Sequence, residues 1–264
     1  MMLRPTSVAT FMFHEVTDDP TSSGFQRPGA MAYKHSRQAF ATCLDQIATA
    51  PERPELVTAV NLTRPDRHIF LSFDDGGRSA LVAAEELERR GWRGHFFIVT
   101  SLVGSQGFLA TEEIRALRRR GHVIGSHSHT HPNIFRSQTP ERMVEEWRAS
   151  CDLLAQLLGE PCVSASVPGG DISSRVLESA RTAGLRYLFT SEPWLTPRRV
   201  GDCWMLGRYS VKVGTSAARV RELAQFRGWT SALLRRRLKV LATRAIPPLY
   251  RFYIRARTKT EPSA

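Results

Sequence analysis

From about Thr10 to Gly207, short apolar runs alternate along the chain with amphipathic stretches of helical period. The runs are mostly continuous in hydrophobicity, which is typical of strands that are covered on both faces of a sheet. They are Thr10–Phe13, Ile69–Phe73, His95–Thr100, Val123–Ser126, Ser164–Val167, Tyr187–Thr190 and Trp204–Leu206. We expect each run to form a strand.

The amphipathic stretches carry helix start and stop signals. Ser36 opens the first helix, whose apolar face carries Phe40, Leu44 and Ile47. The later helices are Ala80–Arg90, Glu112–Arg120, a longer one between Thr139–Pro140 and Gly159, and Arg175–Ala183. Each of these four begins near a hydroxyl residue (Ser79, Thr111, Thr139, and Ser173 or Ser174) and ends at a glycine (Gly91, Gly121, Gly159, Gly184). A hydroxyl can accept the free N–H groups at a helix start, and glycine can adopt the left-handed conformation at its end. Helices that alternate with strands in this way predict an α/β fold around a parallel sheet, open or closed into a barrel.

The pattern changes from Thr215 onward, where apolar residues interleave with arginines and Pro247–Pro248 interrupt the run. This pattern predicts two amphipathic helical pieces with a kink. We therefore expect two regions, a barrel domain over residues 1–214 and a basic amphipathic extension over 215–264. Between Arg219 and Lys259 there are twelve Lys or Arg and one acid, a charge of 12 − 1 = +11, against +12 for the whole chain.

Two interpretations of this basic extension stay open. Cationic amphipathic helices with aromatic residues suit the surface of an anionic membrane, which predicts peripheral membrane binding through residues 219–259. The alternative is a helix that packs on the barrel with its arginines in solvent. No nucleic-acid-binding motif is present, so we expect no nucleic-acid partner.

Composition narrows the class of protein. A chain of 264 residues with 42% hydrophobic content can bury a large core. It contains no apolar run of about 18 residues and no secretory signal pattern, so we expect a cytoplasmic protein. If the basic extension binds membrane, we expect it to do so peripherally, at the inner face. The four cysteines are scattered, which favours reduced, buried thiols over a disulfide framework or a zinc ribbon.

The first chemical signal is Leu71-Ser72-Phe73-Asp74-Asp75-Gly76-Gly77, where an apolar strand leads directly into two carboxylates. Active sites of βα folds gather at the carboxyl ends of strands. Two adjacent anions repel each other unless a cation or a proton lies between them. Asp-Asp-Gly is also an ordinary turn sequence, so this motif alone leaves a structural interpretation open.

The second signal is Gly125-Ser126-His127-Ser128-His129-Thr130-His131-Pro132, which also follows a strand. His127 and His131 lie four residues apart, on the same side of one turn, as a metal requires. His129 falls on the other side and is a poorer ligand. A polar loop with solvated histidines is the alternative, but two histidines with a carboxylate from another strand end form a recognisable metal-binding set.

With these two motifs the chain resembles the NodB-type polysaccharide deacetylases (carbohydrate esterase family 4). Its N-terminal motif around His14 is similar to that of the poly-N-acetylglucosamine deacetylase branch. That family carries a Phe-Asp-Asp-Gly motif and a His-[Ser/Thr]-x-x-His motif, and the resemblance spans about residues 11–207. It implies a distorted, incomplete (β/α) barrel. It also implies that Asp74 is the general base and that Asp75, His127 and His131 bind the metal.

The later motifs depart from the family pattern. The usual Arg-x-Pro-x-Gly reads Ser166-Val167-Pro168-Gly169-Gly170, so Ser166 stands where an arginine normally orients the base. The resemblance puts the backbone N–H of Gly169 at the oxyanion-donor position. Residues 189–194 lack the usual aspartate, and no histidine follows His131 to act as general acid.

Two other residues are candidates for the missing roles. Phe11-Met12-Phe13-His14-Glu15-Val16 is similar to the opening motif of the poly-N-acetylglucosamine deacetylase branch, where an N-terminal histidine is the acid. We therefore expect His14 to be the general acid, the alternative being that it merely ends a strand. We expect Arg208 to replace the missing arginine beside Asp74.

Together these features predict a metal-dependent hydrolase that removes N-acetyl groups from an N-acetylated saccharide, free or lipid-linked, in glycan metabolism. The Asp/His/His ligand set suits Zn²⁺, although Co²⁺, Ni²⁺ or Fe²⁺ could occupy it. Two alternatives remain. One is a hydrolase of another linear C–N amide, and the other is a non-catalytic glycan-binding or partner protein on a decayed barrel.

Overall fold

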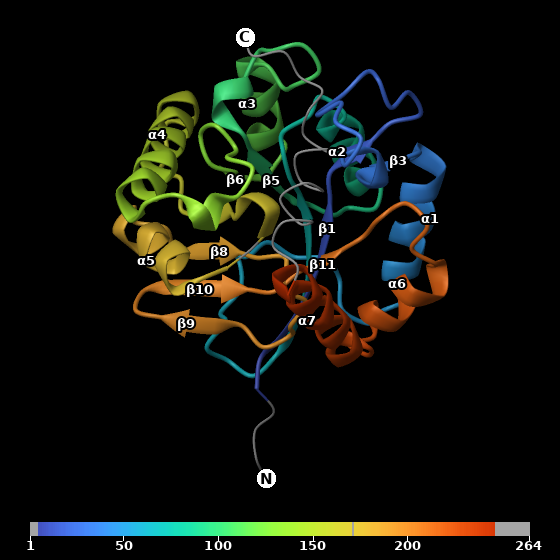
Figure 1. Cartoon of the computed structure of the whole chain (residues 1–264). Coiled ribbons are helices and arrows are strands. Elements are labelled where there is room, and N and C mark those ends of the chain that lie inside the picture. The colour runs from blue at the N-terminus through green and yellow to red at the C-terminus, as the bar shows by residue number, and fades with distance from the viewer. Residues whose placement is uncertain (1–4, 171, 246–264) are drawn as a thin grey trace.

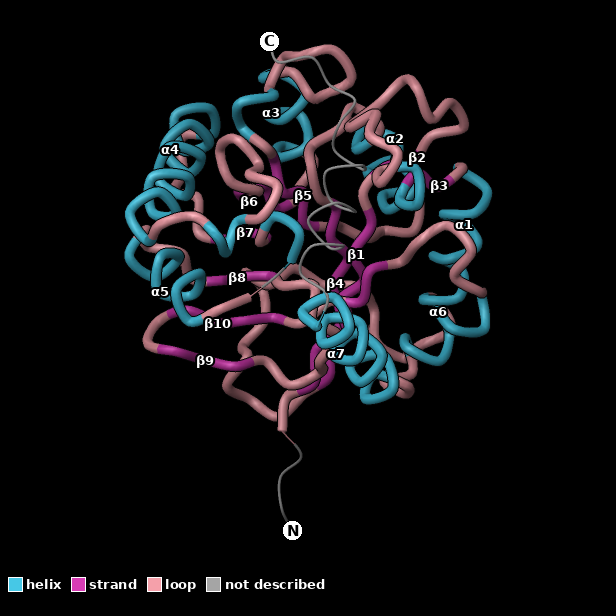
Figure 2. The backbone as a smooth tube through the Cα atoms, viewed as in Figure 1, coloured by secondary structure: helices cyan, strands magenta, loops and turns pink. Residues whose placement is uncertain are grey.

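A curled nine-stranded sheet forms the centre of the computed structural model, which describes residues 5–170 and 172–245 (Figures 1 and 2). In order along the sheet the strands are β11 (Tyr209–Ser210), β1 (Ser7–Phe13), β4 (Arg67–Phe73), β5 (His95–Ile98), β6 (Val123–Ser126), β7 (Ser164–Ser166), β8 (Tyr187–Phe189), β10 (Cys203–Leu206) and β9 (Arg198–Val200). Neighbouring strands from β11 to β10 are parallel, and β9 runs antiparallel to β10. Because the described strands β11 and β9 end the sheet without pairing with each other, the barrel is incomplete, as predicted.

Helices cover the outside of the curled sheet (Figure 1). They are α1 (Arg37–Ile47), α2 (Ala80–Glu88), α3 (Thr111–Arg119), α4 (Pro140–Leu158), α5 (Ser174–Thr182), α6 (Ala217–Ala224) and α7 (Trp229–Ala245). Short 3₁₀ turns occur at Met31–Tyr33, Thr100–Leu102, Phe135–Ser137 and Pro168–Gly170. β2 (Glu15–Val16) and β3 (Lys34–His35) form a separate two-stranded parallel sheet that the hydrophobic pattern did not predict.

Serine and threonine caps set the start of three helices as predicted. Ser36, Thr139 and Ser173 each accept a hydrogen bond from the backbone N–H three residues later, at 3.1, 3.3 and 3.2 Å. Gly159 ends α4 in the left-handed conformation, with φ 70°. The expected cap at Ser79 is wrong, because its hydroxyl instead donates to the Glu15 carboxylate at 2.6 Å.

The strands at the centre of the sheet, such as β4 and β5, are buried on both faces, which explains their continuous hydrophobicity. On β4, Phe73 packs in the main core under the helices, whereas Phe70 packs in a second cluster on the other face. On β5, Phe96 and Phe97 divide in the same way. Apart from the exposed Arg67 at the start of β4, every position of these two strands is therefore buried.

The start of the basic extension packs on the barrel. Helix α6 contacts α1, and Val220 and Leu223 belong to the main core. The Trp229 ring at the start of α7 meets the Phe11 ring edge to face, with centroids 6.2 Å apart. A domain boundary near residue 214 stays a prediction, and Pro247–Pro248 lie outside the described residues. Within residues 5–170 and 172–245, no helix combines the length and hydrophobicity needed to cross a bilayer.

Candidate metal and catalytic site

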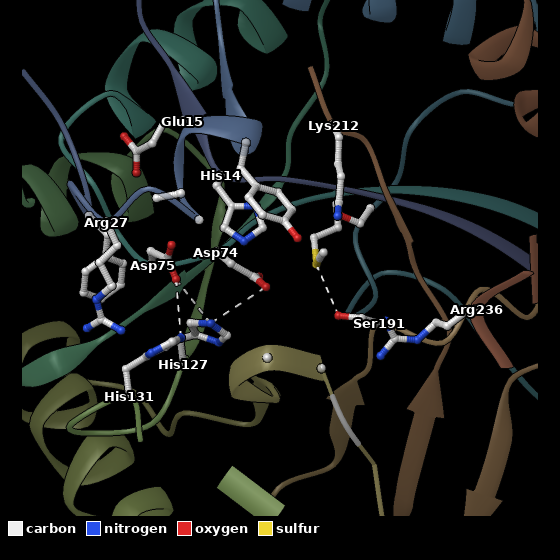
Figure 3. A pocket seen from close by; sticks show the side chains of 18 residues that line it. His14, Glu15, Arg27, Asp74, Asp75, His127, His131, Ser191, Lys212 and Arg236 are labelled. Carbon is white, nitrogen blue, oxygen red and sulfur yellow. Dashed lines mark hydrogen bonds and ion pairs between the residues drawn. The ribbon is translucent and has the colours of Figure 1, made fainter. Parts of the chain in front are cut away.

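The candidate residues meet at the carboxyl ends of the parallel strands (Figure 3). Asp74 and Asp75 follow β4, and His127 follows β6. His14 follows β1, and Gly169 lies in the turn after β7. These side chains and backbone atoms line one cavity of about 280 Å³. The parallel sheet thus gathers residues that are far apart in the sequence.

Asp75, His127 and His131 form a group that can hold a metal ion. One ligand atom from each lies within 4.8 Å of the others. The Asp75 Oδ1 atom is 3.4 Å from His127 Nε2 and 3.8 Å from His131 Nε2. The Nδ1 atom of His127 lies 2.9 Å from the Ser166 carbonyl oxygen, which leaves Nε2 directed at the carboxylate. Two imidazoles and one carboxylate around a shared centre fit the donor set of a catalytic zinc site.

The charges around this group also fit a cation. Burial alone would raise the pKa of Asp75, but the neighbouring histidines outweigh burial and hold it well below its usual range. Burial would lower the pKa of His127, but the Asp74 and Asp75 carboxylates raise it. Burial, with the nearby His127, lowers the pKa of His131 to about 4, which keeps this imidazole neutral, the form that binds metal.

Glu146 of α4 holds the loop that carries the two histidines. Its buried carboxylate accepts hydrogen bonds from the backbone N–H groups of His129 and Thr130, at 3.0 and 2.8 Å. It also accepts from the Thr130 hydroxyl at 2.7 Å and from Arg142 at 2.9 Å. In this loop His131 has a positive φ of 52°, a strained conformation for a non-glycine residue that surrounding contacts must hold.

Asp74 is bound on both carboxylate oxygens by Arg208. The Arg208 Nη1 and Nη2 atoms donate to Asp74 Oδ1 and Oδ2 at 2.7 and 2.9 Å. The Ser166 hydroxyl accepts from Nη2 at 2.7 Å and donates to Asp74 Oδ2 at 3.0 Å. Burial would raise the pKa of Asp74, but the Arg208 guanidinium outweighs it and lowers the pKa, so this carboxylate is charged. Arg208 and Ser166 together orient the Asp74 carboxylate, which is the role expected of the arginine that the sequence lacks at position 166.

His14 lies across the cavity from the histidine loop. Its ring contacts the Tyr33 ring at a centroid distance of 4.4 Å, and no described group bonds its Nδ1 atom. Burial lowers the pKa of His14, although the two aspartates act against burial. The imidazolium is therefore a stronger acid than an exposed one, and a smaller fraction of it is present at neutral pH.

Glu15, next to His14, is a buried carboxyl group of the same cavity. The hydroxyls of Ser23 and Ser79 both donate to it. Burial raises the pKa of Glu15 to about 6. A Cβ atom on Gly77 would lie 2.0 Å from the Glu15 Oε1 atom, so a larger residue at position 77 would clash with this buried carboxylate.

Residues 61–188 match the family model of polysaccharide deacetylases. The resemblance to polysaccharide deacetylases that the sequence motifs predicted is confirmed by this match, which covers just under half of the chain. The peptidoglycan-N-acetylglucosamine deacetylase PgdA of Listeria monocytogenes is 24% identical over 187 residues, which cover 68% of this chain and 38% of PgdA. The YxkH protein of Bacillus subtilis is 23% identical over 169 residues, 64% of this chain and 60% of that protein. The chain thus spans less than two thirds of the length of both relatives.

Two solved structures share the fold of this chain. The polysaccharide deacetylase BC0361 from Bacillus cereus superposes with a TM-score of 0.70 at 18% identity, covering 83% of this chain and 69% of that one. IcaB from Ammonifex degensii gives a TM-score of 0.69 at 22% identity, covering 85% of this chain and 100% of that one. At these identities the likeness establishes the architecture, and the predicted NodB-type barrel is confirmed.

All seven site residues predicted from the sequence lie around one cavity. Asp75, His127 and His131 form the ligand group, and Arg208 binds Asp74 from behind. His14 and Gly169 line the walls. His129 lies outside the ligand group, and its Nδ1 atom is 3.0 Å from the Thr100 hydroxyl. The supporting residues Glu146 and Glu15 were not predicted from the sequence. Only the position of Glu15 beside His14 in the opening motif could have drawn attention to one of them.

We expect Glu146→Gln to weaken metal binding by about 10–100-fold, because an amide cannot accept all the hydrogen bonds that now hold the histidine loop. Competition against a chelator measures the affinity. Glu145→Gln is the matched control, since the Glu145 side chain is 65% exposed and pairs with Arg142 alone among the described residues. Equal affinities in the two variants would show that Glu146 does not support the site.

Proposed function

We propose that this protein is a metal-dependent hydrolase that removes the acetyl group from an N-acetylated saccharide in glycan metabolism. The observation that carries the proposal is the Asp75, His127 and His131 group beside an Asp74 carboxylate that Arg208 holds in its charged form. The match to the polysaccharide deacetylase family model and the name of the relative PgdA support the same reaction. A binding protein would have no need of a fixed, ionised carboxylate next to a ligand group.

The ligands would be Asp75, His127 and His131, and zinc is the metal that suits two imidazoles and a carboxylate, with Co²⁺, Ni²⁺ and Fe²⁺ as other candidates. Such a cation, when bound, polarises an amide carbonyl and lowers the pKa of water. The protein's own contribution is to orient the ligands through the Ser166 carbonyl and the loop held by Glu146.

The remaining chemistry is proton transfer and charge stabilisation by this chain. Asp74 accepts a proton from the attacking water, whose oxygen bonds to the carbonyl carbon. The N–H of Gly169 donates to the developing oxyanion, a contribution typically worth about 10²–10³ in rate. His14 in its protonated form donates to the sugar nitrogen as the C–N bond breaks. The products are acetate and a free amino sugar.

The alternative of a decayed, non-catalytic barrel rested on the missing arginine and the missing late histidine. Arg208 donates to Asp74 from a different strand end, which favours an active enzyme. The second alternative is a hydrolase of another linear amide. It would use the same site residues and would differ from an acetyl hydrolase only in the acyl group that the cavity accepts. We favour acetyl because of the family match.

We also propose that the protein is cytoplasmic and binds peripherally to an anionic membrane through its basic extension. On α7, Leu234 and Leu238 are 58% and 57% exposed. They are one helical turn apart, with the exposed Arg235 and Arg237 between them. Exposed leucines beside arginines suit an interface of acyl chains and anionic headgroups. The residues of the extension beyond Ala245 lie outside the described structure.

For the reaction, we expect Asp74→Asn to lower kcat by about 10²–10⁴-fold while metal content is kept, because the base is lost and the ligands stay. Asp75→Asn should lose metal and activity together. Acetate release from N-acetylglucosamine oligosaccharides and metal analysis of the same samples give both readouts. Wild-type activity in either variant would contradict these roles, and absence of acetate from wild-type, metal-loaded protein across such substrates would contradict the proposed reaction.

For the membrane, we expect the wild type to sediment with vesicles that contain anionic lipid and not with neutral ones. The double variant Leu234→Gln/Leu238→Gln should bind less, because the exposed apolar side chains are lost. Val213→Gln, which changes a 55% exposed residue outside α7, is the control. If the leucine double variant binds as well as Val213→Gln, or if the wild type binds neutral vesicles as well as anionic ones, this surface does not bind anionic membrane.

A further inference from the structure

We infer that helix α7 closes one end of the cavity, so that the enzyme acts on a terminal N-acetylated unit and not on the internal units of a polysaccharide. The inference rests on the proposed function and specifies its substrate class. Arg236 of α7 lines the same cavity as Asp75, His127 and His131. Figure 3 shows Arg236 and His131 on opposite sides of Asp74.

The start of α7 is anchored on one side of the barrel opening. The buried Trp229 ring contacts the rings of Phe11 on β1 and Tyr209 on β11, with centroid distances of 6.2 and 6.4 Å. The indole Nε1 atom of Trp229 donates to the Leu223 carbonyl oxygen of α6 at 3.0 Å. A buried tryptophan with a partner for its N–H is a strong anchor, so this end of the helix is fixed.

The middle of α7 is bound to the other side of the barrel opening. The Arg236 Nε atom donates to the Glu192 Oε1 atom at 2.7 Å, and Glu192 follows strand β8. Partly buried ion pairs are screened less by water and salt than exposed ones, and these two side chains are 27% and 16% exposed. Strands β11 and β8 lie toward opposite ends of the sheet, so α7 connects the two sides of the incomplete barrel (Figure 1).

The cavity that α7 helps to enclose is small. Its volume is about 280 Å³, below the range of about 300–1,000 Å³ that is typical of pockets for drug-sized ligands. A single N-acetylated sugar is smaller than such a ligand, whereas a chain of several sugars is larger. One unit therefore fills the cavity, and the units attached to it must lie outside.

The wall at α7 limits where those attached units can lie. An internal unit of a polysaccharide has a neighbour on each side, so it needs a groove that is open at both ends. The Arg236 and Glu192 side chains fill one of these ends. A terminal unit has one neighbour only, which can leave the cavity on the side away from α7. Exclusion by steric clash discriminates between the two kinds of unit without any change in the reacting groups.

Product analysis on the full, metal-loaded chain tests this inference with the N-acetylglucosamine pentasaccharide. Fragmentation mass spectrometry locates the free amino group in the product. We expect the wild type to deacetylate a terminal unit about tenfold or more often than an internal one. Arg236→Ala and Glu192→Ala should each raise the internal share about fivefold, the upper end of the effect of a partly exposed ion pair. Arg236→Lys can keep the ion pair and should stay near the wild type.

Arg181→Ala is the matched control for these variants. Arg181 pairs with Glu178 at the same distance of 2.7 Å, but on α5 and outside the cavity. A wild type that deacetylates internal units as often as terminal ones would overturn the inference. An internal share that stays unchanged in both Arg236→Ala and Glu192→Ala, or that rises equally in Arg181→Ala, would also do so.

Calorimetric titration separates this inference from the proposed reaction. If only a terminal unit enters the cavity, the wild-type Kd should differ by less than about twofold between the N-acetylglucosamine disaccharide and the pentasaccharide. A groove open at both ends would bind the pentasaccharide more tightly, because further units would contact the protein, and that result would overturn the inference. Binding that is independent of length, without acetate release, would contradict only the proposed reaction.

Discussion

The buried guanidinium of Arg208 is the interaction on which the site depends. Its side chain is fully buried, and its five N–H donors are all used. They bind the Thr190 carbonyl, the Ser72 and Ser166 hydroxyls, and both oxygens of Asp74. These partners come from three strands or strand ends across the curled sheet. A buried charge is tolerated only when it is paired and fully hydrogen-bonded, so Arg208 requires an ionised Asp74 and joins the opposite walls of the barrel.

This arrangement separates the roles of two adjacent carboxylates. Asp74 is turned toward a permanent cation, which keeps it charged and oriented. Asp75, with a positive φ of 76°, is turned toward two histidines that can share a metal. The strained backbone at Asp75 lets neighbouring side chains face different partners. A strained backbone conformation persists only where surrounding contacts fix it. Here the buried contacts of both aspartate side chains do so.

The parts of the fold that could be predicted are those encoded in local sequence. The seven continuous apolar runs each contain a strand of the sheet (β1, β4, β5, β6, β7, β8 and β10), and hydroxyl and glycine positions predicted the helices between them. The two-residue strands β2, β3 and β11 carry too few positions for any periodicity and were missed, as was β9, whose three residues are all exposed. Ser79 was misassigned as a cap because its buried partner, Glu15, lies 64 residues away in sequence.

In the site, too, residues in local motifs could be predicted and residues that act through distant partners could not. Asp75, His127 and His131 were recognisable because each motif follows a strand, and the ends of parallel strands meet. Arg208 was expected beside Asp74 only because the family pattern has an arginine at position 166, where this chain has Ser166. Glu146 was not predictable, because its partners are backbone N–H groups of a loop, which leave no mark in the residue types.

The central claim, that Asp75, His127 and His131 bind a metal, is tested most directly by metal content. Mass spectrometry of purified wild type, His127→Ala, His131→Ala and the control His129→Ala provides it without knowledge of the substrate. The account predicts about one metal per chain in the wild type and in His129→Ala, and loss in the other two variants. A wild type that takes up no metal after reconstitution, or triad variants that keep it, would contradict the account.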